Sequence, residues 1–65
     1  MQCQLASNII RSMSFSDNIL TLHWAKYTKR YYNVPTEVGY GLAYNSNPLG
    51  YFNTNIKNKF KTIKL

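Results

Sequence analysis

Cationic and aromatic side chains alternate in one short stretch near the middle of the chain. The stretch contains Lys26, Tyr27, Lys29, Arg30, Tyr31 and Tyr32. Proteins that bind single-stranded nucleic acids combine cations, which follow the phosphate backbone, with aromatic rings on which the bases stack. If the stretch is a β-strand, Arg30 and Tyr32 share one face and present a charge beside a stacking surface. This pattern favours a noncatalytic module that binds RNA or another nucleic acid.

Further cations follow near the end of the chain and suit contacts with phosphates. The eight Lys and Arg side chains outnumber the two acidic ones, and the resulting net charge of +6 favours polyanionic partners. In the alternative interpretation, the tyrosines fill the core and the lysines form a solvated face that keeps the protein in solution. The predicted nucleic-acid-binding residues are Lys26, Lys29, Arg30, Tyr32, Lys57, Lys59, Lys61 and Lys64.

Residues that could support catalysis or bind a metal are few. General acid–base catalysis needs two titratable groups brought together, but Asp17 is explained by a turn and Glu37 by the start of a helix. Cys3 and His23 are the only soft metal ligands, too few for a structural zinc site. A single cysteine also excludes an intramolecular disulfide bond. We therefore expect no enzyme and no cofactor.

A second class of function remains open. A small basic protein of phage or mobile-element origin can act in counter-defence, by inhibiting a host protein or by sequestering an anionic signalling nucleotide. Tyrosine-rich surfaces make good anchors for protein partners. The chain is rich in Asn, Lys, Ile and Tyr, which fits the AT-rich genomes common among such elements. A complex that resists nuclease would distinguish this function from RNA binding.

Apolar side chains recur at every second position before Pro35. Leu20, Leu22 and Trp24 give the clearest alternation, which predicts a strand over residues 20–24 with His23 facing solvent. Residues 9–15 and 29–33 predict two further strands, and residues 16–18 a tight turn. Two successive isoleucines at positions 9 and 10 cannot both face a core in a regular strand, which indicates either a bulge or a two-sided environment at this end. Residues 1–6 are expected to form a loose end. The last residues either extend the second helix or form a short edge strand, since Ile63 and Leu65 alternate with Lys64.

Helical patterns begin at Pro35, whose ring fixes φ and keeps the preceding residue extended. We predict one helix over residues 35–44 and a second over 48–59, with Asn47 as its N-cap and Pro48 in its first turn. The chain is thus a single α+β domain over residues 1–65, a three-stranded antiparallel β-meander followed by two short α-helices packed on one face. The predicted core is Met13, Phe15, Leu20, Leu22, Trp24, Tyr31, Val34, Val38, Leu42, Phe52, Ile56 and Phe60.

Four segments together resemble the KTSC domain, a small stand-alone module that also occurs at the C-terminus of some lysyl-tRNA synthetases. They are residues 7–15, 20–24, 31–35 (Tyr-Tyr-Asn-Val-Pro) and 50–56 (Gly-Tyr-Phe-Asn-Thr-Asn-Ile). Lys29 stands where the family has the first tyrosine of a Tyr-x-Tyr motif. The resemblance implies an RNA-binding role, suggested for the family by its attachment to the synthetase. The structural motif residues that it implies are Tyr31, Val34, Pro35, Phe52, Asn53 and Ile56.

The size and hydropathy of the chain limit its partners. A domain of 65 residues buries only about 60% of the surface that its unfolded chain exposes, so a homo-oligomer would add useful burial. No apolar run approaches the roughly 18 residues that span a membrane. The first six residues lack the basic start and apolar core of a signal peptide. We therefore expect no membrane partner and a cytoplasmic location, in the host if the protein is phage-encoded.

Overall fold

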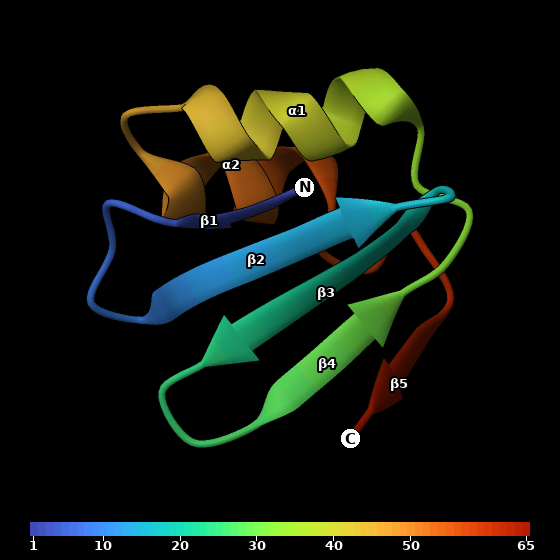
Figure 1. Ribbon diagram of the computed structural model, residues 1–65, viewed down its shortest axis with the longest axis horizontal. Helices are drawn as coiled ribbons and strands as arrows, with labels where there is room; N and C mark the ends of the chain where they lie inside the picture. The colour runs from blue at the N-terminus through green and yellow to red at the C-terminus, as the bar shows by residue number, and fades with distance from the viewer.

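The computed structural model describes all 65 residues and contains one antiparallel sheet and two helices (Figure 1). The five strands lie in the sheet in chain order, and both helices pack together on one side of it. The α+β class and the two helices are confirmed, whereas the predicted number of three strands is wrong. The elements are β1 (Gln2–Gln4), β2 (Ile10–Ser16), β3 (Ile19–Trp24), β4 (Thr28–Tyr31), α1 (Thr36–Tyr44), α2 (Pro48–Asn55) and β5 (Thr62–Lys64).

The two additional strands lie at the two edges of the sheet. β1 pairs with β2, and Leu5, which follows it, is only 9% exposed, so residues 1–6 do not form the loose end that the sequence predicts. β5 returns after the helices and pairs with β4, where Ile63 lies opposite Arg30. Each edge strand has three residues, and the side chains of β5 are all exposed. β1 therefore lacks the apolar alternation by which strands are found in a sequence, and at β5 the only such signal is the alternation of Ile63 and Leu65 with Lys64.

The hairpin between β2 and β3 has the predicted turn and, of the two arrangements predicted for its other end, the bulge. Asp17 and Asn18 connect the strands with φ values of 53° and 62°, a left-handed geometry that suits the twist of two-residue hairpins. At the other end of the hairpin, the register shifts between Ile10 and Ser12. The bulge lets Ile10 be fully buried while Ile9 stays 49% exposed.

The same turn anchors the connection from the sheet to α1. The Asn18 side-chain nitrogen donates a hydrogen bond to the Val34 carbonyl at 2.9 Å, and the Val34 N–H donates to the Asn18 carbonyl at 2.9 Å. The chain turns at Asn33, whose φ is 58°, and α1 begins directly after Pro35. Asn18 thus satisfies the backbone at this position, and Asn53, which could either bond to this backbone or contact a ligand, is exposed.

α2 begins as predicted but ends four residues early. The Asn47 side chain accepts a hydrogen bond from the Gly50 N–H at 3.2 Å, which caps the helix. At the other end, the N–H groups of residues 56 and 57 both donate to the Phe52 carbonyl at 2.9 Å, and Asn58 adopts a left-handed φ of 61°. This turn directs the chain toward β5. Lys57 and Lys59 therefore lie beyond the helix.

The core lies between the helices and the inner face of the sheet. Nine predicted core residues are buried, and two further members of the buried hydrophobic core, Leu5 and Ile10, were not predicted. Trp24, Val38 and Phe60 pack against the core but are only partly buried. Neither helix has the length and apolar character needed to cross a membrane. The confirmed core residues are Met13, Phe15, Leu20, Leu22, Tyr31, Val34, Leu42, Phe52 and Ile56.

Candidate functional site

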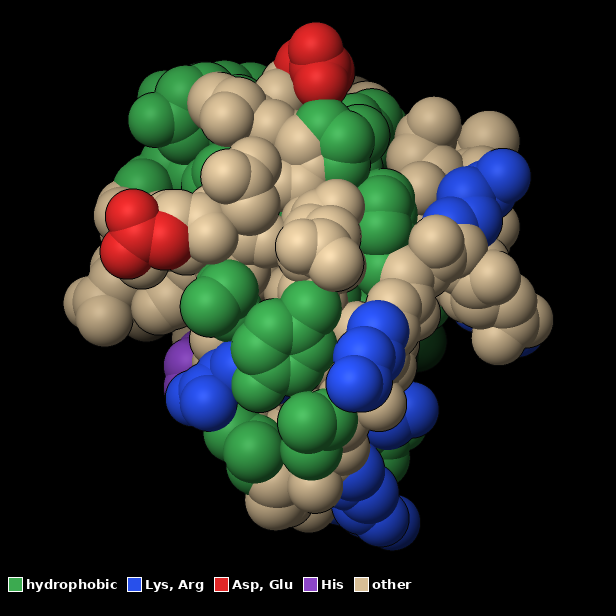
Figure 2. All heavy atoms as spheres, turned by 90° about the vertical axis from the view of Figure 1, so that its right-hand side faces the viewer, with side chains coloured by type: hydrophobic (Ala, Val, Ile, Leu, Met, Phe, Trp, Pro, Cys, Tyr) green, Lys and Arg blue, Asp and Glu red, His purple; other side chains and the backbone are tan.

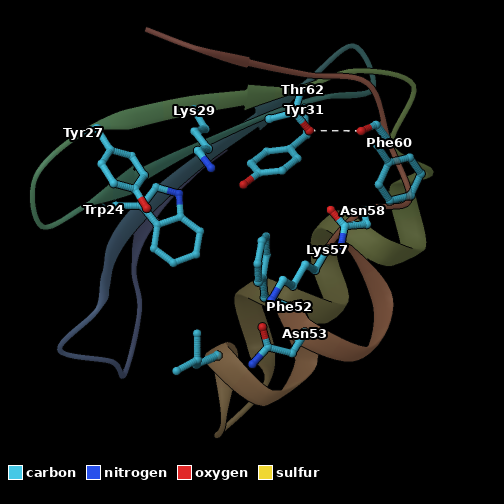
Figure 3. Close-up of a pocket in the computed structure, with 11 residues that line it drawn as sticks. Trp24, Tyr27, Lys29, Tyr31, Phe52, Asn53, Lys57, Asn58, Phe60 and Thr62 are labelled. Atoms are coloured by element: carbon cyan, nitrogen blue, oxygen red, sulfur yellow. Dashed lines mark hydrogen bonds between the residues drawn. The ribbon is translucent and has the colours of Figure 1, made fainter.

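A pocket of about 500 Å³ opens between the end of the sheet and α2 (Figure 3). The strands β3 and β4 and the turn between them form one wall, and α2 with the segment after it forms the other. This volume lies within the range of sites for small molecules. The pocket has aromatic and cationic side chains in its wall, namely Trp24, Tyr27, Tyr31, Phe52, Phe60, Lys29 and Lys57.

Three aromatic rings hold the two walls of the pocket together. Phe52 of α2 meets Trp24 edge to face with ring centroids 5.0 Å apart, and it meets Tyr31 in the same way at 5.8 Å. Such edge-to-face pairs are favourable because the positive edge of one ring approaches the negative face of the other. Phe52 and Tyr31 are buried, so core packing fixes this part of the wall.

Two lysines meet at the sheet side of the pocket. Lys29 on β4 lies directly opposite Lys64 on β5. Their ammonium nitrogens lie 5.2 Å and 5.1 Å from the centroid of the Tyr27 ring, close enough for cation–π attraction. Like charges directly opposite each other on neighbouring strands are destabilising. The two acidic side chains, Asp17 in the β2–β3 turn and Glu37 in α1, are not in the pocket wall, so no acidic side chain there offsets the lysines.

The same wall carries hydrogen-bond donors. The indole N–H of Trp24 is buried beside the Tyr31 hydroxyl and makes no hydrogen bond of good geometry. Burial raises the pKa of the Tyr31 hydroxyl above its ordinary value; the nearby Trp24 indole partly opposes the increase, and Tyr27 adds to it. Tyr31 therefore remains a neutral O–H donor at neutral pH. Figure 3 shows the Lys29 ammonium and the Tyr31 hydroxyl directed toward the Trp24 side of the pocket.

The structure divides the predicted nucleic-acid-binding residues between different surfaces. Lys29 and Lys57 line the pocket, and Lys64 reaches the Tyr27 ring at its edge. Arg30 and Tyr32 lie outside the pocket and line two hollows, and Ile63, which lies opposite Arg30 on β5, shares the hollow of Tyr32. The alternation of β4 turns Arg30 to the face opposite Lys29, and beyond the strand the Tyr32 N–H still donates a hydrogen bond to the Lys61 carbonyl at 2.9 Å.

The remaining predicted cations lie outside the pocket. Lys26 is exposed in the β3–β4 turn and Lys59 is exposed after α2, while Lys61 shares a hollow with Tyr32. Figure 2 shows Lys and Arg side chains on the lower and right-hand parts of one side of the molecule, and acidic side chains only toward its top and left. Positive charge is thus concentrated away from the two acids on this side.

Sequence reasoning missed several residues of the pocket. Trp24 and Phe60 were expected in the core, but both are partly buried and line the pocket. Tyr27 is 38% exposed, and its ring lies close to the ammonium groups of Lys29 and Lys64. Asn53 and Asn58 are exposed at the rim. In the sequence, only the short separation of Trp24 and Tyr27 could have indicated that these residues belong to one site.

The residues that carry the family resemblance are mostly structural. Tyr31, Val34, Phe52 and Ile56 are buried in the core, and Pro35 immediately precedes α1. Their positions indicate a structural role for these residues and assign no ligand to them.

No three His, Cys, Asp or Glu side chains gather where they could hold one metal ion. His23 is exposed, as predicted, and contacts the Thr28 hydroxyl at 3.3 Å. In comparisons with known proteins, no family model matches the chain and no curated protein shows a significant match.

Proposed function

We propose that the protein is a noncatalytic module that binds single-stranded nucleic acid across its pocket face, defined here by Lys29, Lys57, Lys64 and the Tyr27 ring. The observation that carries the proposal is the pair of lysines opposite each other on β4 and β5, beside an aromatic pocket. Phosphates supply the negative charge that this face lacks, and exposed rings offer surfaces on which bases stack.

Lysines that merely keep a protein in solution need no particular arrangement. Lys29 and Lys64 instead lie at the one register position where their charges repel most directly. Local rules are commonly broken at functional sites, where a partner supplies the compensating interaction. A polyanion bound between the two strands would turn the repulsion into attraction.

The resemblance to the KTSC domain favours the same function. The segments 31–35 and 50–56 resemble the KTSC domain, for which attachment to a tRNA synthetase suggests a role with RNA. This support concerns a class of ligand only, because a fold does not determine a function.

The proposal is tested by fluorescence anisotropy with a labelled single-stranded oligonucleotide of about 12 residues, long enough to cover a small domain. Contacts with about four phosphates predict that the logarithm of the affinity falls with the logarithm of the salt concentration with a slope near −3. In the triple variant Lys29→Gln/Lys57→Gln/Lys64→Gln, the slope should become shallower by about 2, because about 0.7 is lost per phosphate contact.

The matched control is Lys26→Gln/Arg30→Gln/Lys59→Gln, which removes the same number of charges outside the pocket face. It should keep most of the slope, and circular dichroism should show both variants folded. Equal losses in the two triple variants would mean that only net charge matters. Binding that ignores salt, or no binding at about 100 mM salt, would contradict the proposal. A nuclease-resistant protein complex from host lysate, with no oligonucleotide binding, would favour the counter-defence alternative instead.

A further inference from the structure

The pocket combines two kinds of surface. Its sheet side gathers donors and positive charge, namely the Lys29 ammonium, the Tyr31 hydroxyl and the buried indole N–H of Trp24. Its α2 side is formed by Phe52, by Lys57 and by two exposed amides, Asn53 and Asn58 (Figure 3). We call the first surface the donor corner and the second the amide rim.

The donor corner contains hydrogen-bond donors and positive charge but no negatively charged acceptor. The Tyr31 hydroxyl is the only group among the three that can also accept a hydrogen bond. The second lysine of the pair, Lys64, adds positive charge at the edge of the pocket, where its ammonium lies 5.1 Å from the centroid of the Tyr27 ring. A phosphate group supplies several oxygen acceptors and a negative charge at once, and such charge-assisted hydrogen bonds are stronger than neutral ones.

The rest of the pocket suits a planar, polar ring. Trp24 and Phe52 form a preorganised aromatic wall, because their rings already pack edge to face at 5.0 Å. The amides of Asn53 and Asn58 each offer a donor and an acceptor to the edge of a base. The volume of about 500 Å³ leaves room for a ligand of this size.

We infer that the pocket is a site for one nucleoside monophosphate unit, with the phosphate in the donor corner and the base between the aromatic wall and the amide rim. The inference rests on the proposed function, because it places the ligand on the same pocket face, and it adds which part of the ligand this pocket takes. The unit is either a terminal or unpaired nucleotide of a strand or a free nucleotide.

Trp24 is the only tryptophan of the chain, so its fluorescence reports on this pocket alone. The full-length protein is titrated with AMP, GMP, CMP and UMP, with adenosine and inorganic phosphate as references and excitation at the red edge of the indole band. At least one nucleotide should quench Trp24 saturably. Adenosine and phosphate alone should each bind at least about tenfold more weakly, because each makes only part of the contacts.

Two charge variants make the test specific to the donor corner. Lys29→Gln should weaken nucleotide binding about tenfold, because it removes a charge-assisted contact. Lys59→Gln removes the same charge from an exposed position outside the pocket, and should change binding less than about twofold because solvent and salt screen it. Equal effects of the two substitutions, or no saturable quenching by any of the four nucleotides, would overturn the inference.

The outcome separates this inference from the proposed function. If oligonucleotides bind with the expected salt dependence while all four nucleotides leave Trp24 unchanged, the nucleotide site is wrong and strand binding stands. If nucleotides bind and oligonucleotides do not, the site stands with a free nucleotide as its ligand and strand binding is wrong. If neither binds, both are wrong. If both bind, comparing AMP with 5′-phosphorylated and unphosphorylated oligonucleotides identifies the source of the phosphate.

Discussion

The ring of Trp24 on β3 meets the ring of Phe52 on α2 edge to face, with centroids 5.0 Å apart and planes inclined by 80°. Phe52 also contacts Tyr31, so one side chain of the helix joins two neighbouring strands. Phe52 is buried and belongs to the core, while Trp24 is partly buried and forms the pocket wall. The contacts that form the pocket wall are therefore also contacts that stabilise the fold.

Replacing Phe52 should destabilise the protein strongly. Phe52→Ala removes a buried ring and leaves a cavity between sheet and helix, which typically costs about 3–5 kcal/mol. Phe52→Leu keeps most of the volume and should cost less than about 1.5 kcal/mol. Urea denaturation followed by circular dichroism measures both values. A small domain has only about 5–15 kcal/mol of stability, so Phe52→Leu remains measurable even where Phe52→Ala does not fold. A cost below about 1 kcal/mol for the alanine variant would contradict the packing described here.

Local signals in the sequence predicted the elements that local chemistry determines. The alternation of Leu20 and Leu22 located β3, the Asp17–Asn18 pair located the hairpin turn, and Asn47 located the start of α2. Each of these signals acts within a few residues of the chain. The successive isoleucines predicted a bulge or a two-sided environment for the same reason, because alternation permits only one of them to face the core.

The features that sequence reasoning missed or left open depend on residues distant in the chain. β1 and β5 are strands only because β2 and β4 offer them partners, and their own side chains are mostly exposed. The hydrogen bonds between Asn18 and Val34 join the hairpin turn to the start of the helices. In the candidate site, the sequence identified Lys29 and Lys64 as cations but could not place them opposite each other. That arrangement exists only once β5 has joined the sheet.

Gly39 in α1 should resist substitution even by alanine. A Cβ atom at this position would lie 2.8 Å from Cδ1 of the Phe15 ring, closer than packed atoms approach. Alanine favours a helix by about 1 kcal/mol over glycine, but overpacking of a core typically costs about 1–3 kcal/mol. We therefore expect Gly39→Ala to lower the free energy of unfolding, as measured by urea denaturation.

Two further variants test the cause of that loss. Tyr44→Ala lies in the same helix at a position that is 82% exposed, so its effect should stay within about 0.5 kcal/mol. In a Phe15→Leu background, Gly39→Ala should cost less, because the smaller side chain relieves the clash, and the double-mutant cycle should show coupling of about 0.5 kcal/mol or more. A stabilising effect of Gly39→Ala in the unaltered protein would contradict the contact with Phe15.

Burial of Tyr31 predicts a loss of stability in alkaline solution. Desolvation raises the pKa of Tyr31 in the folded protein above its ordinary value, so above about pH 10 the unfolded chain releases this proton first. The folded state then binds more protons than the unfolded state, and the free energy of unfolding falls as pH rises from about 10 through the folded-state pKa. Tyr31→Phe lacks the hydroxyl and should lose less stability over this range. The difference between the two proteins is the informative quantity, because the other tyrosines and the lysines titrate in both. Urea denaturation at about pH 8 to 11 provides it, and parallel pH dependences in the two proteins would show that the Tyr31 hydroxyl ionises as freely when folded as when unfolded.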